Sequence, residues 1–508
     1  MPRNHSHTGD SAGIDRRSVL RSSAAVGAVA LGGVTIGTTS APARSEGATA
    51  PEDGVGYQYF HREWTEIEAD LERVADLGVS AIWIPQPAVS KLSWEDLTYE
   101  DQEGFYDGEG EESVYGRERD PHPPLGYQPV DLRDFDSAHG TEDELASLIE
   151  TAHEHDIDVI VDVVLNHMAN PDGPDGEVEY PQFDPDEHFH DYGTLGDCEL
   201  EGEEAEMYEC DLLDLPSLDV EHPEVQAAHE AYLRKIADLG ADGLRIDAAA
   251  HVWPWYFREH INPLADELGL WRVGEVWEEE DVDHLLEFAD TGMTVFDFPL
   301  YDAIMEAFEG GSMEALSREE ARGVVHERPE AAVTFVQNHD TTGPEVEPNE
   351  PEGRAVELAE AFVLAYAGMP MLYRGGAEQR PELEDDDLRA LVEVSRSLAE
   401  GAVIDRHVDE DVYVFEREGN LLAGINTADE DRTVTVETDW RTEPLVDHAG
   451  DGTNVTTGPD CTVELTVPAE GWVMYGPRKS GSADPDPPGE PNPPADPEPL
   501  ADDCYSSH

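Results

Sequence analysis

Residues 241–251 read ADGLRIDAAAH, which places Arg245 and Asp247 inside an apolar run. Leu244 and Ile246 alternate with these two charged residues, and alternate residues of a β-strand face the same side. One face of the strand is therefore apolar, and the other carries a cation beside a carboxylate. A buried carboxylate is costly unless a partner keeps it ionised, and Arg245 is such a partner. Taken alone, the pair fits either a structural ion pair or a catalytic nucleophile.

Seven more short apolar runs lie on either side of this one. In chain order the eight are VGYQYF (55–60), VSAIWIPQP (79–87), DVIVDVVLNH (158–167), ADGLRID (241–247), WRVGEVW (271–277), MTVFDFPL (293–300), AVTFVQNHD (332–340) and GMPMLY (368–373). Amphipathic segments, such as 143–155 and 223–239, separate them. Eight strand-like runs that alternate with helices predict an α/β protein, a (β/α)8 TIM barrel over residues 51–400.

Two stretches do not follow the alternation of strands and helices, and they predict further domains. Residues 168–212 are polar and rich in Pro, Gly and Asp, so we expect an inserted loop domain after the third strand. Alternating strands without helices follow, and they predict a C-terminal antiparallel β-sandwich over residues 401–477. The last segment, 478–508, is rich in Pro and Asp and is expected to be disordered.

The chain is strongly acidic, with 116 Asp and Glu against 30 Lys and Arg and a net charge of −86. The acid is spread along the whole chain, which indicates a solvated acidic surface rather than an acidic tail for a basic partner. We interpret it as adaptation to high salt, where counterions screen the self-repulsion; an acidic protein of ordinary salt is the alternative. Nucleic acid is excluded as a partner because like charges repel.

The N-terminus predicts export. Arg16 and Arg17 precede a weakly apolar run, and Ala41-Pro42-Ala43 then forms a small-x-small cleavage signature. Residues 1–43 therefore read as a twin-arginine signal peptide, and we expect a secreted monomer. A permanent membrane anchor is the alternative, but the run is weakly hydrophobic and a cleavage site follows it, so we expect no stable anchor.

Four cysteines remain after this signal, and none forms a CxxC pair, which argues against zinc. Cys198 and Cys210 flank a short loop and are candidates for a disulfide outside the cell. Cys461 with Cys504 is a second, weaker pairing.

Polar residues end several of the predicted strands: Asn166-His167, Asp247, Glu275 and Asn338-His339-Asp340. In a TIM barrel these strand ends meet at one mouth, where catalytic groups lie. Three converging acids would repel one another unless Arg245 and hydrogen bonds separate their pKa values, which is the arrangement that acid/base catalysis requires.

The chain resembles the α-amylase family of retaining glycoside hydrolases, family 13. The resemblance is carried by DVVLNH (162–167), GLRIDAAAH (243–251), GEVW (274–277) and FVQNHD (335–340), supported by GVSAIWIPQP (78–87), GYQPVDL (126–132), LPSLD (215–219) and GMPMLYRGG (368–376). These motifs stand in the family's order. Together with the export signal and the acidic surface, they suggest a secreted, haloarchaeal-type member.

The resemblance implies a role for each site residue. Asp247 would be the nucleophile, Glu275 the general acid/base, and Asp340 would hold and distort the sugar just before the scissile bond. Arg245 would orient Asp247 and lower its pKa, which keeps the nucleophile ionised. The implied substrate-binding residues are Tyr127, as a stacking platform, with His167, His339 and His251.

Three departures from the family pattern bear on binding. Ala250 stands where amylases often have Lys, Ser217 where many have a calcium-ligating Asp, and Leu125 where His is common. The resemblance still points to Ca²⁺, held by the Asn166 side chain and the His251 carbonyl, with Asp211 as a third ligand. The alternative is that the protein needs no bound Ca²⁺, because high salt and the acidic surface stabilise the fold in its place.

The expected function is hydrolysis of internal α-1,4 bonds, with starch, glycogen or maltooligosaccharides as substrates. An exo-acting maltooligosaccharide-forming enzyme or a transglycosylase on the same scaffold is the alternative. A catalytically dead binding relative is a third hypothesis, and the intact trio of Asp247, Glu275 and Asp340 argues against it.

Overall fold

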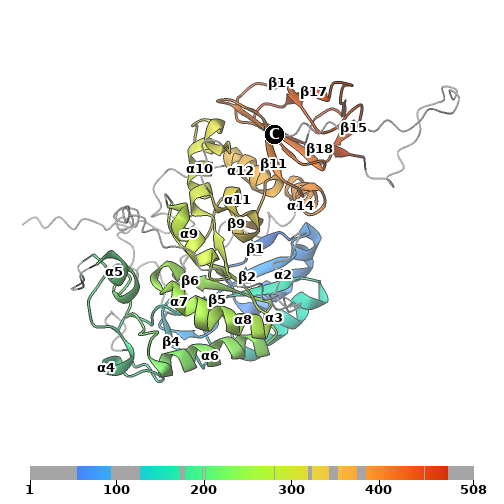
Figure 1. Cartoon of the computed structure of the whole chain (residues 1–508). Helices are drawn as coiled ribbons and strands as arrows, with labels where there is room; N and C mark the ends of the chain where they lie inside the picture. Colours follow the sequence, from blue (N-terminus) through green and yellow to red (C-terminus); the bar gives the residue numbers. More distant parts are fainter. Residues whose placement is uncertain are drawn as a thin grey trace, which may run out of the picture.

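The computed structural model describes residues 54–92, 126–171, 178–196, 198, 200, 202–279, 281–318, 323–341, 353–373, 385–450 and 452–478. Within these ranges a parallel barrel is followed by an antiparallel β-domain, which lies at the top of Figure 1. No helix in this part of the chain is long and apolar enough to cross a bilayer. The signal peptide at 1–43 and the tail beyond residue 478 lie outside the described residues and stay predictions.

The barrel confirms the expected (β/α)8 fold. Its eight strands are β1 (Gly56–Gln58), β2 (Ala81–Ile84), β5 (Asp158–Val164), β6 (Gly243–Asp247), β7 (Trp271–Gly274), β8 (Thr294–Phe296), β9 (Ala332–Thr334) and β10 (Met369–Leu372). All neighbours pair in parallel, and β1 closes the ring between β2 and β10. Each strand falls within one of the eight apolar runs, because a strand covered on both faces must be apolar along its length.

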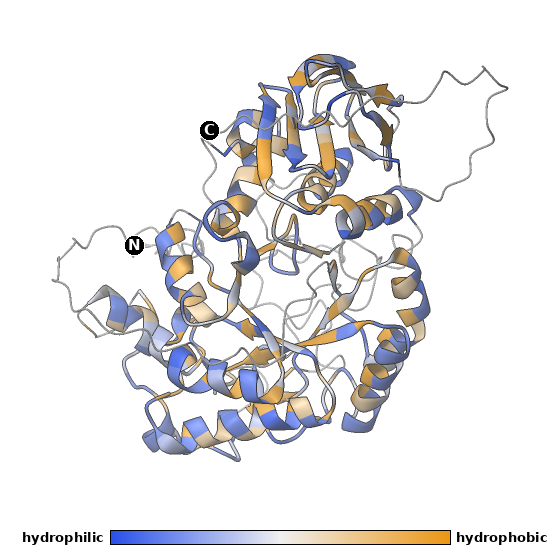
Figure 2. Ribbon diagram, turned by 45° about the vertical axis from the view of Figure 1, so that its right-hand side comes forward, coloured by the Kyte–Doolittle hydropathy of each residue, from blue (hydrophilic) through white to orange (hydrophobic). Residues whose placement is uncertain are grey.

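The outer helices include α2 (Trp64–Leu77), α3 (Glu142–Glu154), α6 (Pro223–Asp238), α8 (Asn262–Leu268), α9 (Val282–Ala289), α10 (Phe298–Phe308), α12 (Arg354–Ala365) and α14 (Asp386–Leu398). A capping box begins α3: the Thr141 hydroxyl accepts from the Glu144 amide, and the Glu144 carboxylate accepts from the Thr141 amide. Figure 2 shows apolar and polar residues alternating along these helices, as expected when one face covers the barrel and the other meets water.

Between β5 and α6 the chain leaves the barrel and forms the short helices α4 (Pro185–His188) and α5 (Glu203–Glu209), at the lower left of Figure 1. Cys198 and Cys210 form a disulfide across this insertion, as the sequence suggested. The second suggested pair involves Cys504, which lies outside the described residues.

The C-terminal strands form two packed antiparallel sheets, which confirms the expected β-domain. The larger sheet has the order β11 (Val403–Val408), β12 (Val412–Arg417), β13 (Leu421–Asn426), β18 (Gly471–Pro477), β15 (Pro444–Asp447) and β16 (Val455–Thr456). β14 (Arg432–Glu437) pairs with β17 (Thr462–Val467). Side chains from both sheets share one apolar cluster that includes Val414, Val436 and Val473, so the arrangement is a sandwich.

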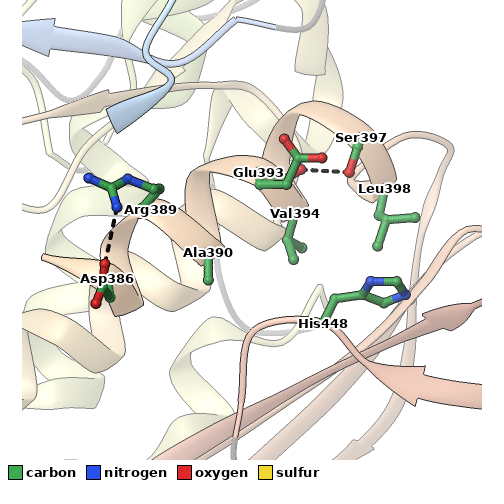
Figure 3. Close-up of a pocket in the computed structure, with 8 residues that line it drawn as sticks. All are labelled: Asp386, Arg389, Ala390, Glu393, Val394, Ser397, Leu398 and His448. Carbon is green, nitrogen blue, oxygen red and sulfur yellow. Dashed lines mark hydrogen bonds and ion pairs between the residues drawn. The ribbon is translucent and has the colours of Figure 1, made fainter. Parts of the chain in front are cut away.

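The sandwich is tied to the barrel through α12 and α14. The buried Arg417 guanidinium donates to the carbonyls of Ala365 and Tyr366 at the end of α12, where helix carbonyls lack intrahelical partners. A pocket of about 450 Å³ lies between α14 and His448 (Figure 3). Its Arg389 pairs with Asp386 on the same helix, 3.0 Å apart. This pocket is a feature of the domain interface and contains none of the predicted catalytic residues.

Candidate active site

Three neighbouring barrel strands bring carboxylates to one place. Asp247 is the last residue of β6, Glu275 directly follows β7, and Asp162 lies within β5. In the β5–β6 register Asp162 stands opposite Arg245, and Val164 stands opposite Asp247. Because parallel strands of a barrel end at the same rim, Asp247 and Glu275 meet at its C-terminal mouth.

Arg245 connects all three acids. Its side chain is 1% exposed. Nη1 donates to Asp247 Oδ1 at 2.8 Å and to Asp162 Oδ2 at 3.0 Å, while Nη2 donates to Glu275 Oε1 at 2.5 Å. Burial alone would lower the pKa of Arg245, but the surrounding carboxylates hold it well above its usual value, so the guanidinium stays charged.

The two terminal nitrogens of one guanidinium therefore bind one carboxylate each, Asp247 and Glu275. A retaining glycosidase needs its two carboxyl groups about 5–5.5 Å apart, and this arrangement is compatible with that spacing. The second oxygen of Glu275 accepts from the Ala248 amide at 2.8 Å. Ala248 has φ 46°, a left-handed conformation that is unusual for alanine. The turn after Asp247 is thus bent so that its backbone holds Glu275.

Arg245 acts on Asp247 in the expected direction, but burial has the larger effect. Burial raises the pKa of Asp247 well above its usual value, and Arg245 lowers it without reversing the shift. Burial also raises the pKa of Asp162 to about 6, against the attraction of Arg245 and a hydrogen bond from Tyr127. One cation is thus shared among three buried acids, and the cluster favours holding a proton.

The other predicted substrate-binding residues surround this cluster. Tyr127 stacks on His339 with ring centroids 5.2 Å apart, and His339 Nε2 lies 3.3 Å from Asp340 Oδ2. Asp340 is more open than the other two acids of the trio, with its side chain 25% exposed against 11% for each of them. His167 Nε2 lies 3.0 Å from the Tyr127 carbonyl oxygen, and burial lowers the pKa of His167 to about 4, so its ring is neutral near pH 7.

Sequence reasoning missed three residues that position this site. Asp162 accepts hydrogen bonds from the Tyr127 hydroxyl at 2.8 Å and from Trp83 Nε1 at 3.2 Å, besides Arg245. The ring of Trp83 also lies 4.9 Å from the Arg245 guanidinium carbon. Gln58, at the end of β1, contacts His339 Nδ1 at 2.8 Å. The available signal was the charge of Asp162 within an apolar strand, which requires a buried partner.

The candidate calcium ligands come from three segments: Asn166 follows β5, Asp211 lies in the insertion, and His251 lies in the short turn after β6. The Leu218 amide donates to the Asn166 carbonyl at 2.9 Å, and the Ser217 amide donates to the Asp211 carboxylate at 2.9 Å. His251 Nδ1 lies 3.2 Å from the Met207 carbonyl oxygen, so that nitrogen is engaged with α5. An amide oxygen, a carboxylate oxygen and a carbonyl oxygen are the types of ligand that Ca²⁺ prefers. They would supply three of the six to eight oxygens that it binds. The buried Ser217 adds no charge.

Comparison with known proteins agrees with this geometry. Residues 61–382 match the family described as the α-amylase catalytic domain. The α-amylase of Bacillus licheniformis is 26% identical over 448 residues, which cover 74% of this chain and 82% of that protein. A cyclomaltodextrin glucanotransferase of Bacillus sp. (strain 38-2) is 26% identical over 392 residues, and this chain spans about half of its length (51%).

Solved structures show the same fold. An Anoxybacillus α-amylase superimposes with a TM-score of 0.66 at 20% identity, covering 85% of this chain and 100% of that one. An α-amylase from Geobacillus thermoleovorans in complex with acarbose has a TM-score of 0.64 at 19% identity, covering 84% and 99%. The family match covers most of the barrel, including the strands that carry the acid cluster, and the chain therefore belongs to the α-amylase family of glycoside hydrolases.

Proposed function

We propose that this glycoside hydrolase cleaves internal α-1,4 bonds of starch or glycogen with retention of configuration. The observation that carries the proposal is the pair of carboxylates, Asp247 and Glu275, held at one guanidinium. Asp340 and the Tyr127–His339 stack border that pair, where the sugar on the non-reducing side of the scissile bond would lie.

The proposed reaction has two displacements. The Asp247 carboxylate attacks the anomeric carbon while Glu275 gives its proton to the departing glycosidic oxygen, which breaks the C–O bond and leaves a glycosyl ester on Asp247. Glu275 then takes a proton from water, and that water attacks the anomeric carbon and frees Asp247. Arg245 stabilises the ionised Asp247 in both steps.

The first prediction concerns the nucleophile. Asp247→Asn keeps the shape but removes the attacking charge, so kcat should fall roughly 10⁴-fold while maltooligosaccharide binding survives. Glu275→Gln should lose least on a glycosyl fluoride, whose leaving group needs no proton. A fluorinated glycosyl donor should label Asp247, as seen by peptide mass spectrometry. Label on another carboxylate would refute the assignment, and a lowered melting temperature in the Asn variant would favour a structural ion pair.

The second prediction concerns Asp162, which competes with Asp247 for Arg245. Asp162→Asn removes a nearby negative charge, so the pKa of Asp247 should fall and the acid limb of the kcat/KM profile should move to lower pH. Asp242→Asn is the matched control, because Asp242 lies at the opposite end of β6, where it accepts from the Val159 amide. The idea fails if the acid limb of Asp162→Asn stays in place or moves to higher pH.

The alternative function is transglycosylation, and the glucanotransferase relatives favour it as a second candidate. The two reactions share the glycosyl-enzyme and differ in whether water or a sugar hydroxyl takes the glycosyl group. A time course of products from soluble starch separates them. We expect a broad ladder of maltooligosaccharides that shortens with time; one dominant short product would indicate exo action, and cyclic or lengthened chains would indicate transfer.

We also propose that Ca²⁺ binds through the Asn166 side chain, the Asp211 carboxylate and the His251 carbonyl, and joins the insertion to β5. An ion bound by the folded state stabilises it by mass action. Chelation at moderate salt should therefore lower the melting temperature before activity is lost, and Asn166→Ala should reduce the effect of chelation. If chelation changes neither property, the proposal is wrong.

We further propose export through the twin-arginine pathway and adaptation to high salt, supported by Arg16-Arg17 and by the net charge of −86. Mature protein in the culture medium would support the first point. For the second, the screening length grows from about 3 Å at 1 M salt to about 30 Å at 0.01 M, so charges on the acidic surface repel over longer distances. Dialysis into dilute buffer should lower both the melting temperature and activity; no change in either would contradict the interpretation.

A further inference from the structure

The sandwich contains the sequence triplet at which N-linked sugars are attached. Asn454-Val455-Thr456 follows the pattern Asn-x-Ser/Thr, with a residue other than proline in the middle. The earlier match, Asn4-His5-Ser6, falls within the predicted signal peptide, and no other asparagine begins such a triplet. Short motifs of this kind also occur by chance, so the surroundings of Asn454 determine whether it is usable.

The triplet lies at an open edge of the larger sheet. β16 consists of Val455 and Thr456 and pairs with β15 on one side, through Leu445 and Pro444. It is the last strand in the order of that sheet, so its other side has no strand partner within the described ranges. β15, its neighbour, is labelled at the right of the sandwich in Figure 1. A bulky group attached directly before β16 therefore displaces no paired strand.

Burial alternates along the triplet. Asn454 and Thr456 are exposed, whereas Val455 between them is half-buried and packs against the apolar cluster of the sandwich. Residues two apart in an extended chain face the same side. The acceptor amide and the hydroxyl two residues later, which a glycosyltransferase must both contact, therefore lie together on the solvent side.

The fold makes little use of these two polar groups. Asn454 Oδ1 accepts from the Asp447 amide at 3.4 Å, which is a long contact, and Nδ2 has no hydrogen-bond partner among the residues that the structure describes. The Thr456 hydroxyl has none in the same part of the chain. Attachment of a sugar to Nδ2 therefore breaks no hydrogen bond of the fold and leaves no buried group unpaired.

The backbone before the acceptor is held in place. The Asp447 carboxylate accepts from the Gly452 amide at 2.7 Å, and the Tyr475 hydroxyl donates to the Thr453 carbonyl at 3.0 Å. Asn454 consequently has a defined position on the surface of the folded sandwich. A transferase can reach it there after folding as well as in the nascent chain.

The opposite edge of the same sheet contacts the barrel. β11 is the strand at that edge, and its Asp405 accepts from the Arg318 amide of the barrel at 3.0 Å. Asn454 precedes the strand at the other edge. A sugar attached to it should therefore leave this contact between the two domains unchanged.

We propose that Asn454 carries an N-linked glycan in the exported protein. Asn454 Nδ2 attacks the anomeric carbon of a sugar that is carried on a polyprenyl phosphate or diphosphate. A C–N bond forms, the C–O bond to the phosphate breaks, the amide gives up one proton, and the polyprenyl phosphate or diphosphate leaves. A glycosyltransferase of the host catalyses the step. The inference rests on the proposed export, which brings the chain to this enzyme.

A glycan at this position would protect the open edge of the sheet. Unpaired strand edges can pair with other chains, and like charges on an acidic surface oppose such contacts. At 1 M salt the screening length is only about 3 Å, so this repulsion weakens under the conditions to which the protein is proposed to be adapted. A glycan acts through its bulk, which salt does not screen.

The test uses mature protein recovered from the culture medium of the source organism. After proteolysis, mass spectrometry of the peptide that contains Asn454 should show an increase by the mass of one or more sugars, and fragmentation should place it on Asn454. Thr456→Val keeps the β-branched shape but removes the hydroxyl, so the sugar should be lost. Thr456→Ser is the matched control, because it preserves the triplet and should retain the sugar.

Asn454→Gln is a second, independent variant and should also lose the sugar. All three variants should keep the wild-type kcat/KM for starch, because both residues are exposed on the sandwich. An unmodified Asn454 in exported wild-type protein would overturn the proposal, as would a sugar that persists in Thr456→Val. If the protein stays in the cells, export and glycosylation fail together, and the distribution between cells and medium identifies that case.

Discussion

One buried guanidinium and three carboxylates determine how this site works. Arg245 contacts Asp162, Asp247 and Glu275, whose side chains are at most 11% exposed, and it carries a single positive charge. Ionising all three acids would leave two uncompensated negative charges in a buried site, which is costly. The cluster is therefore suited to hold a proton. A retaining hydrolase needs that state, with one ionised carboxylate and one protonated carboxyl group side by side.

The backbone around the cluster fixes which carboxylate faces which donor. The left-handed Ala248 directs its amide toward Glu275, and the Ala250 amide donates to the Glu275 carbonyl at 3.1 Å. The turn that follows the proposed nucleophile thus holds the proposed acid on the next strand. The ends of β6 and β7 are paired at Ile246 and Gly274, so the turn between them and Glu275 has little conformational freedom. The strained backbone of Ala248 persists for this reason.

Much of the barrel could be predicted because buried parallel strands need unbroken apolar runs, and the predicted helices at 143–155 and 223–239 agree with α3 and α6 to within a residue at each end. Asp247 and Asp340 could be found because each ends such a run, and Glu275 because it is a charged residue within one. Asp162 could not be assigned because its role depends on the strand register that places it opposite Arg245. The lowering effect of Arg245 on the pKa of Asp247 was predicted, but the net rise was not, because sequence shows the charged neighbour and not the depth of burial.

Hydrogen bonds within the insertion connect it to the backbone beside the acid cluster. Asp211 bonds to the Ser217 amide with its carboxylate and pairs with Thr194 through its backbone, while Ser217 pairs with His167 beside the acid cluster. A disulfide closes the loop between Cys198 and Cys210, immediately before Asp211. The disulfide, the Asp211 bonds and the Ser217–His167 pairing therefore all act on one stretch of backbone that ends beside the acid cluster. Because ordering this stretch costs conformational entropy, whichever of these contacts forms first lowers the cost of the others, and they should reinforce one another.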